Sequence, residues 1–137
     1  MSAHSFETQK ITAVFCHGVA ALVDCKLSND SYLVEGKTIT GFANIEEDLT
    51  DAFAGQRVMP WRLEDALKER GANSVMGGRF KAFCVRDGQL ITGQQQYSGR
   101  NGAQMVISAL SAPIRTSAPA GEIATANRRL WRGSRAA

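Results

Sequence analysis

The feature that most constrains this fold is the run of a cysteine, a histidine and a glycine at Cys16-His17-Gly18. The apolar run 11–15 before it predicts a buried strand, and the small and apolar run 19–23 after it predicts the start of a helix. Cys16 then occupies the sharp turn of a nucleophile elbow, with cysteine in place of the usual serine. Because N–H groups at a helix N-terminus favour an anion, this position predicts a lowered thiol pKa and a reactive thiolate.

Length and composition predict one ordinary domain with its own core. The chain has 137 residues, of which 44% are hydrophobic, and it has no apolar run long enough to predict a membrane span. The polar residues 1–10 do not have the apolar segment of a secretory signal. Three cysteines without metal-ligand spacing predict free thiols in a reducing compartment, the cytoplasm.

The positive charge is concentrated near the C-terminus. Residues 113–137 hold five arginines and one glutamate, so the remaining 112 residues carry a net charge of −1 within an overall +3. Residues 1–112 therefore form the predicted domain, and the Ser-, Ala- and Arg-rich residues 113–137 form a basic tail that we expect to be disordered. Scattered arginines without interleaved aromatic residues disfavour a nucleic-acid partner.

Strand and helix signals alternate along the domain. We expect strands at 11–15, 32–34, 37–42, 80–85 and 90–92, and helices from the elbow to about 25, and at 45–53, 60–70 and 102–110. Pro60 fits a first helical turn, Trp61 belongs to the predicted buried stripe of that helix, and Asp87-Gly88 predicts a tight hairpin turn. The pattern predicts an α/β fold with a mostly parallel sheet and a C-terminal hairpin.

Cys16 and His17 are the candidate chemical groups. A buried core cysteine is the alternative for Cys16, but the adjacent histidine at a strand-to-helix junction favours a nucleophile. No histidine follows His17, which excludes the late histidine of a class I glutamine amidotransferase or papain-like triad. A histidine base needs a carboxylate to orient it, and the candidates are the acids at 46–48, which alternatively stabilise a helix N-terminus. Cys25 and Cys84 lie in apolar stretches of the sequence, so we predict that they are packing residues.

Four strings in this order resemble the ThiJ/PfpI superfamily of class I amidotransferase-like proteins, and within it the heat-shock, glyoxalase III-like branch. They are AVFCHGVAAL (13–22), EGKTITGFANIEE (35–47), LEDALKERGA (63–72) and DGQLITGQ (87–94). The resemblance covers residues 11–110 and implies a flavodoxin-like sandwich. Since family members carry about a hundred residues before the nucleophile strand, it also implies that this chain corresponds to the C-terminal half of the family domain.

By position, the resemblance implies that Cys16 is the nucleophile, His17 the neighbouring histidine and Glu47 the carboxylate that completes the triad, with Glu46 as second choice. It implies that Gly18 and Val19 contact the substrate, and it implies neither a cofactor nor a metal. The family activities are cofactor-free conversion of methylglyoxal to lactate, deglycase or amidase-like hydrolysis, and holdase chaperoning, all in a stress-response setting. In the glyoxalase reading the thiolate adds to the aldehyde, His17 moves a proton between the two carbons, and collapse releases lactate.

The chain also departs from the family pattern. Val19 replaces a proline usual after the Cys-His-Gly run, and Gln95-Gln96-Tyr97 replaces an Asn-Pro-Ala-like stretch. A half-domain would expose an unpaired strand edge, so we expect a second copy or a complementary chain to cover it, or a truncated, weakly active product. The competing hypothesis is a non-catalytic, chaperone-like or interaction module derived from the same fold.

Overall fold

The computed structural model describes residues 3–111, so the predicted tail at 113–137 lies outside the described residues. Within the described residues there are four α-helices, two 3₁₀ helices and five strands, and their bounds differ in places from the expectation. In chain order the elements are α1 (Ala3–Glu7), β1 (Thr12–Phe15), the 3₁₀ helix η1 (Cys16–Leu22), β2 (Thr38–Ile39), α2 (Asn44–Ala54), α3 (Leu63–Glu69), β3 (Asn73–Ser74), β4 (Cys84–Asp87), β5 (Leu90–Gly93), the 3₁₀ helix η2 (Gln96–Ser98) and α4 (Gly99–Ser111).

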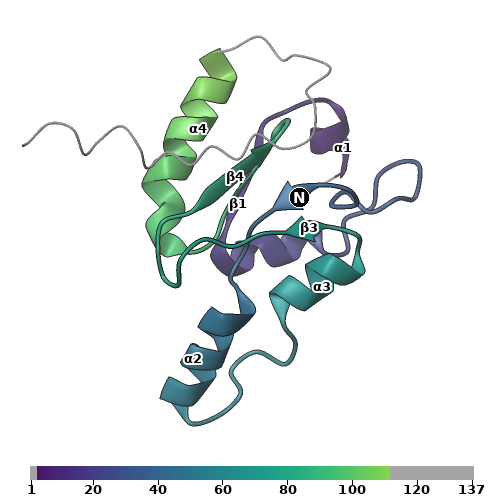
Figure 1. The fold of residues 1–137 in the computed structure, drawn as a ribbon. Coiled ribbons are helices and arrows are strands. Elements are labelled where there is room, and N and C mark those ends of the chain that lie inside the picture. Colours follow the sequence, from purple (N-terminus) through teal and green to yellow (C-terminus); the bar gives the residue numbers. More distant parts are fainter. Residues whose placement is uncertain (1–2, 112–137) are drawn as a thin grey trace, which may run out of the picture.

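The three-stranded sheet has the order β1-β5-β4, with β1 and β4 labelled in Figure 1, and the Cys16 turn directly follows the edge strand β1. β1 pairs parallel with β5, with Phe15 opposite Gly93, and β4 pairs antiparallel with β5. The predicted Asp87-Gly88 turn is confirmed, since Asp87 pairs with Leu90 and Gly88 has a φ of 62°, which suits the first position of a tight hairpin turn. A second, two-stranded parallel sheet joins β2 and β3. The mixed α/β architecture with mostly parallel pairing is the one expected.

Packing around Phe15 holds α4 against the sheet. A Cβ atom added at Gly93 on β5 or at Gly102 on α4 would overlap the Phe15 ring, so glycine is required at both positions. Because a closely packed interior yields little to an inserted methyl group, these two glycines fix how closely α4 approaches β1 and β5. Helix α4 lies along this sheet, while α2 and α3 lie at the other end of the molecule (Figure 1).

The main core lies between η1, the β2 region and α3. It consists of apolar side chains with at most 9% of their surface exposed: Val19, Leu22, Val23, Leu33, Val34, Ile39, Phe42, Leu63, Leu67, Ala72 and Leu90. Burying a side chain of this size contributes about 1.5–3 kcal/mol, so this cluster is what holds η1 and the α2–α3 region together. The Cys16 turn, which begins η1, is therefore attached directly to this core.

Polar side chains tie β2 to the hairpin. The Asp87 carboxylate accepts a hydrogen bond from the Thr38 backbone N–H at 2.8 Å, and the Thr92 hydroxyl accepts one from the Thr40 N–H at 2.9 Å. These bonds satisfy backbone donors that no strand pairs, because β2 is only two residues long. They keep the chain that enters α2 close to the carboxyl end of β5.

Several predicted elements are wrong in extent or type. The helix after the elbow is a 3₁₀ helix that ends at Leu22, and residues 32–34 form turns with one isolated bridge at Tyr32 in place of a strand. The strand predicted at 80–85 begins only at Cys84, and the strand predicted at 37–42 is limited to β2. For the three predicted strands, local β-propensity was present, but among the described residues no neighbouring strand lies there to pair with it.

The helix predicted at 60–70 begins at Leu63, and Trp61 is not part of a buried stripe. Trp61 is 40% exposed, and Leu63 and Leu67 are the buried residues of α3. Residues before the helix are held by α2, since the Val58 N–H donates to Asp51 at 2.8 Å and the Arg62 side chain also binds Asp51. Tertiary contacts with α2 therefore override the helix-starting preference of Pro60.

Candidate active site

Cys16 directly follows strand β1 and is the first residue of η1. Its φ of 55° lies in the left-handed region, which a residue with a Cβ seldom adopts. Such a conformation costs on the order of 1–3 kcal/mol and is held only when the surrounding structure enforces it. The parallel pairing of β1 with β5 and the packing of η1 on the core enforce it here. The backbone thus has the strained strand-to-helix turn that the Cys-His-Gly run predicted.

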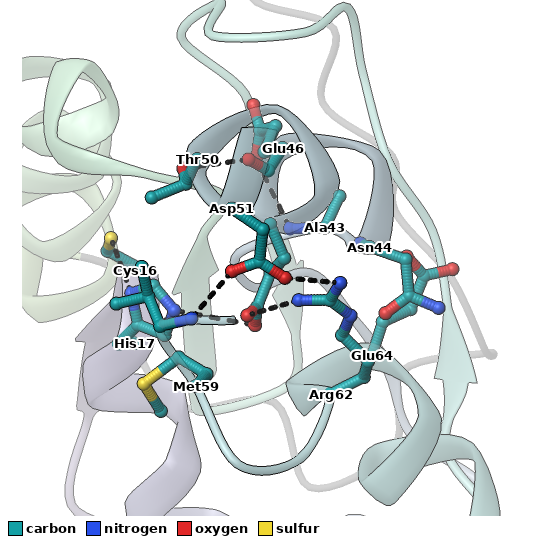
Figure 2. Close-up of polar contacts among 12 residues, drawn as sticks. Cys16, His17, Ala43, Asn44, Glu46, Thr50, Asp51, Met59, Arg62 and Glu64 are labelled. Carbon is teal, nitrogen blue, oxygen red and sulfur yellow. Dashed lines mark hydrogen bonds and ion pairs between the residues drawn. The ribbon is translucent and has the colours of Figure 1, made fainter. Parts of the chain in front are cut away.

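Three predicted residues come together in one row (Figure 2). The Cys16 Sγ atom lies 3.7 Å from His17 Nδ1, and His17 Nε2 lies 3.4 Å from Glu47 Oε1. Among the described residues, neither Nε2 nor this Oε1 has another hydrogen-bond partner, so the two atoms face each other as an ion-pair contact without hydrogen-bond alignment. The row can pass a proton from the thiol towards the imidazole, with the carboxylate behind the ring.

The His17 ring is held by an aromatic contact. It stacks on Phe42 with ring centroids 4.3 Å apart, and Phe80 meets the other part of Phe42 edge-on at 6.3 Å. Stacked and edge-on geometries of this kind are worth about 0.5–1.5 kcal/mol beyond the buried area. Phe42 comes from the segment between β2 and α2, so the same segment fixes the imidazole and leads into the helix that carries Glu47.

Glu47 is buried on the first turn of α2, with 2% of its side chain exposed. Besides His17, it contacts Arg62, whose Nη1 atom lies 3.2 Å from Glu47 Oε2. Arg62 also donates to Asp48 at 2.6 Å and to Asp51 at 2.8 Å. A buried carboxylate needs a charged or hydrogen-bonding partner of this kind to offset its lost hydration. The sequence did not indicate Arg62, because it was assigned to the interior of a helix.

Glu46 is equally buried but serves a different purpose. Its Oε1 atom accepts hydrogen bonds from the Phe80 N–H at 2.6 Å and from Gln94 Nε2 at 2.8 Å, and its Oε2 accepts from the Ala43 N–H at 3.2 Å. Gln94 in turn accepts from the Gly77 N–H at 2.8 Å. Glu46 therefore fastens the loop before β4 to α2 and is not directed at His17.

The expected lowering of the thiol pKa is wrong. Burial raises the pKa of Cys16, and the negative charges of Glu46 and Glu47 raise it further, whereas the backbone N–H groups of His17 and Gln96 act in the opposite direction. The sequence argument counted the N–H groups of the turn but not the desolvation of the sulfur or the two buried carboxylates beside it. At neutral pH the resting state is therefore a thiol, and a base must remove its proton.

The other predicted positions have plain structural settings. Gly18 is exposed, with open space where a Cβ would be, whereas Val19 is fully buried in the core and offers no exposed surface to a substrate. Cys84 is buried and Cys25 packs against the core, as expected for packing residues. Within residues 3–111 no group of histidine, cysteine and acidic side chains is arranged to hold a metal ion, and no helix is long and apolar enough to cross a bilayer.

Comparison with known proteins places this geometry in a family. No family model matches the chain. The chain is 32% identical over 106 residues to glutathione-independent glyoxalase HSP31 of Saccharomyces cerevisiae, a match that covers 73% of this chain and 44% of that protein. A probable glutathione-independent glyoxalase, hsp3103 of Schizosaccharomyces pombe, is 27% identical over 110 residues, covering 77% of this chain and 42% of that protein.

A solved structure agrees. Glyoxalase III of Candida albicans superimposes with a TM-score of 0.67 at 27% identity, covering 78% of this chain and 46% of that one. The fold and the site thus define a partial flavodoxin-like domain with a cysteine on a nucleophile elbow. The chain belongs to the ThiJ/PfpI superfamily, in its glyoxalase III-like branch, and it spans about half the length of the curated relatives it matches.

Proposed function

We propose that the chain carries the reactive half of a glutathione-independent glyoxalase, which converts methylglyoxal to lactate without a cofactor. The observation that carries the proposal is the row from Cys16 through His17 to Glu47 at the carboxyl end of β1. It is supported by relatives that are named glutathione-independent glyoxalases. Deglycase-like hydrolysis would use the same thiol and the same proton acceptor.

The proposed reaction begins with the thiol. His17 Nδ1 accepts the Cys16 proton as the sulfur adds to the aldehyde carbon, and the aldehyde oxygen then takes this proton from His17 and becomes the hydroxyl of a hemithioacetal. Because the pKa of Cys16 is raised by burial, proton transfer to His17 is needed for the attack. The left-handed turn at Cys16 holds the sulfur at the sheet edge, where an aldehyde can approach it.

The imidazole then moves a proton between carbons. It removes the proton from the carbon bonded to sulfur, giving an enediol, and returns a proton to the neighbouring carbon. This leaves a lactoyl thioester on Cys16, in which one carbon has been oxidised and the other reduced. Water then cleaves the thioester, which releases lactate and restores the thiol. Glu47 stabilises the imidazolium that forms in each proton transfer.

Lactate formation from methylglyoxal tests this proposal. We expect turnover by the purified protein, and we expect Cys16→Ala to abolish it. Cys25→Ala is the matched control, because Cys25 is a partly buried thiol that packs against the core away from the His17–Glu47 row. Equal turnover by Cys16→Ala and the unaltered protein, or no turnover by the unaltered protein, would contradict the proposal.

A non-catalytic interaction module is the second candidate, and exposed apolar side chains on α2 favour it. Ile45, Leu49 and Phe53 recur every four residues and are 42%, 40% and 95% exposed. Apolar surface of this kind marks contact sites in folded proteins. Suppression of client-protein aggregation that persists in Cys16→Ala would support this candidate, whereas lactate formation that depends on Cys16 supports the enzyme.

We also propose that a second copy or a complementary chain covers the outer edge of β1. Within residues 3–111, β1 pairs with β5 alone, so its other edge is free to pair. The expected result is a molar mass above that of one chain in sedimentation equilibrium, and a monomer at all concentrations would refute it. The cytoplasmic location stays a prediction from the free thiols.

A further inference from the structure

Arg62 occupies an unusual position for an arginine next to a reactive thiol. Its side chain is 17% exposed and touches three carboxylates, on Glu47, Asp48 and Asp51, all from α2. Figure 2 shows the Arg62 guanidinium pointing at the Asp51 carboxylate. Arg62 precedes α3 directly, so it joins that helix to the acidic face of α2.

Glu47 depends on this cation. A carboxylate with 2% of its side chain exposed loses most of its hydration, and that loss is tolerated only with a charged or hydrogen-bonding partner. The contacts of Glu47 within the described residues are with His17, at 3.4 Å, and Arg62, at 3.2 Å. A neutral imidazole cannot compensate a buried negative charge, so Arg62 carries that role.

Two further carboxylates hold the guanidinium in place. Asp51 accepts the Val58 backbone N–H at 2.8 Å, and this bond, together with Arg62, lowers the pKa of Asp51. Asp51 is therefore ionised at neutral pH and keeps its 2.8 Å bond to Arg62. Since a guanidinium is planar and donates in fixed directions, binding Asp48 and Asp51 at one nitrogen sets where the other nitrogen points, which is towards Glu47.

The charge on Glu47 decides which imidazole nitrogen is free. An ionised carboxylate at Glu47 Oε1 favours a proton on His17 Nε2, which leaves Nδ1 unprotonated and facing Cys16 Sγ. An arginine that never touches the sulfur thus acts on it through two intervening side chains.

We propose that Arg62 is a positioning residue, which compensates the buried charge of Glu47, holds this carboxylate towards His17 and thereby sets the pH range in which Cys16 is nucleophilic. The charged and titratable groups that face this row are Cys16 and His17 from η1, Glu46, Glu47, Asp48 and Asp51 from α2, and Arg62 before α3. Arg62 is the cation that these contacts supply. Removing its charge leaves the nearby carboxylates without a compensating cation. The proton of the Cys16 thiol is then held more tightly, and the thiol is activated only at higher pH.

The test is the rate of Cys16 carbamidomethylation by iodoacetamide as a function of pH, followed on the Cys16 peptide by mass spectrometry. For Arg62→Met we expect the midpoint of the rate profile to move to higher pH and the rate at pH 7 to fall roughly three- to tenfold. Arg62→Lys keeps the positive charge but not the planar guanidinium with its several donors, so its midpoint stays in place while the rate falls at every pH. Arg86→Met, on β4 next to the hairpin turn, is the control and leaves the profile unchanged.

A merely structural role would lower the rate without moving the midpoint, and that result for Arg62→Met would overturn the proposal. If Arg62→Met does not fold, the single variant Glu47→Gln is compared with the double variant that carries both Glu47→Gln and Arg62→Met. Neither of these variants leaves the charge of Glu47 buried without a partner. The proposal requires equal midpoints for these two proteins, because Arg62 acts through Glu47, and a further shift in the double variant would refute it.

This inference deepens the proposed function, and the experiment keeps the two apart. The alkylation profile reports the thiol and requires no aldehyde turnover. A protein without glyoxalase activity whose midpoint still shifts in Arg62→Met would refute the proposed function and support the role of Arg62. A protein that forms lactate but shows no shift would do the reverse.

Discussion

The two sides of the first turn of α2 carry adjacent glutamates with equal burial and different surroundings. Glu46 is 0% exposed and is surrounded by neutral donors, which are two backbone N–H groups and the Gln94 amide. Glu47 is 2% exposed and lies between a guanidinium and an imidazole. Glu46 therefore connects two segments of the fold, and Glu47 is the carboxylate of the proposed reactive site.

The difference shows that burial alone does not identify a functional carboxylate. Donors fixed in the backbone satisfy Glu46 completely and give it no partner that can change its charge. Glu47 has a titratable neighbour, and the contact atoms of the pair lack other hydrogen-bond partners within the described residues. Glu47 thus has the incomplete hydrogen bonding next to a titratable group that the proposed proton transfer requires.

The largest effect on stability is expected from Glu46→Ala. The substitution leaves the Phe80 N–H and the Gln94 amide buried without their acceptor, and we expect the free energy of unfolding to fall by about 3 kcal/mol. Urea denaturation measures it. Glu47→Ala is the comparison and should cost less than half as much, because Arg62 keeps its bonds to Asp48 and Asp51. Equal losses would remove the distinction between the two glutamates.

The reverse ranking is expected for catalysis. Glu47→Gln keeps the shape of the side chain but removes the charge behind His17, so we expect kcat/KM for methylglyoxal to fall about 10²-fold with little change in stability. Steady-state lactate formation measures this loss. Glu69→Gln, an exposed glutamate at the end of α3, serves as control. Unchanged kcat/KM in Glu47→Gln would show that the carboxylate does not serve the imidazole.

The smallest effect is expected from Glu46→Gln on the pH dependence of Cys16. The charge of Glu46 raises the pKa of Cys16, so its removal lowers that pKa and moves the alkylation profile to lower pH. The iodoacetamide rate profile on the Cys16 peptide measures the shift, with Glu64→Gln as a more distant control. A shift to higher pH would mean that Glu46 acts on the thiol by something other than its charge.

The local arrangement around the thiol could be predicted from the sequence. The apolar run before Cys16, the glycine after His17 and the hairpin signal at Asp87-Gly88 each depend on neighbours in the chain, and the structure contains β1, the turn and the β4–β5 hairpin at these places. Glu47 was found through the family resemblance. The residue pattern by itself left the acids at 46–48 open.

The contacts made by Arg62 could not be predicted. Arg62 and Glu47 are 15 residues apart in the chain, with Glu47 on α2 and Arg62 just before α3, so no periodicity relates them. The strand expected at 32–34 and the start of α3 failed for the same reason, since both depend on what lies beside the segment. The thiol pKa was predicted with the wrong sign, because desolvation is a property of the packed protein.

The amino-acid order by itself determined where the cysteine turn lies, its imidazole neighbour and the alternation of strands and helices, because these follow from the hydrophobic pattern over a few residues. Only the tertiary structure decided which of two adjacent glutamates faces the imidazole and which cation stands behind it. The physical reason is that charge compensation in a buried site is set by distances between distant segments, and these exist only once the core has formed.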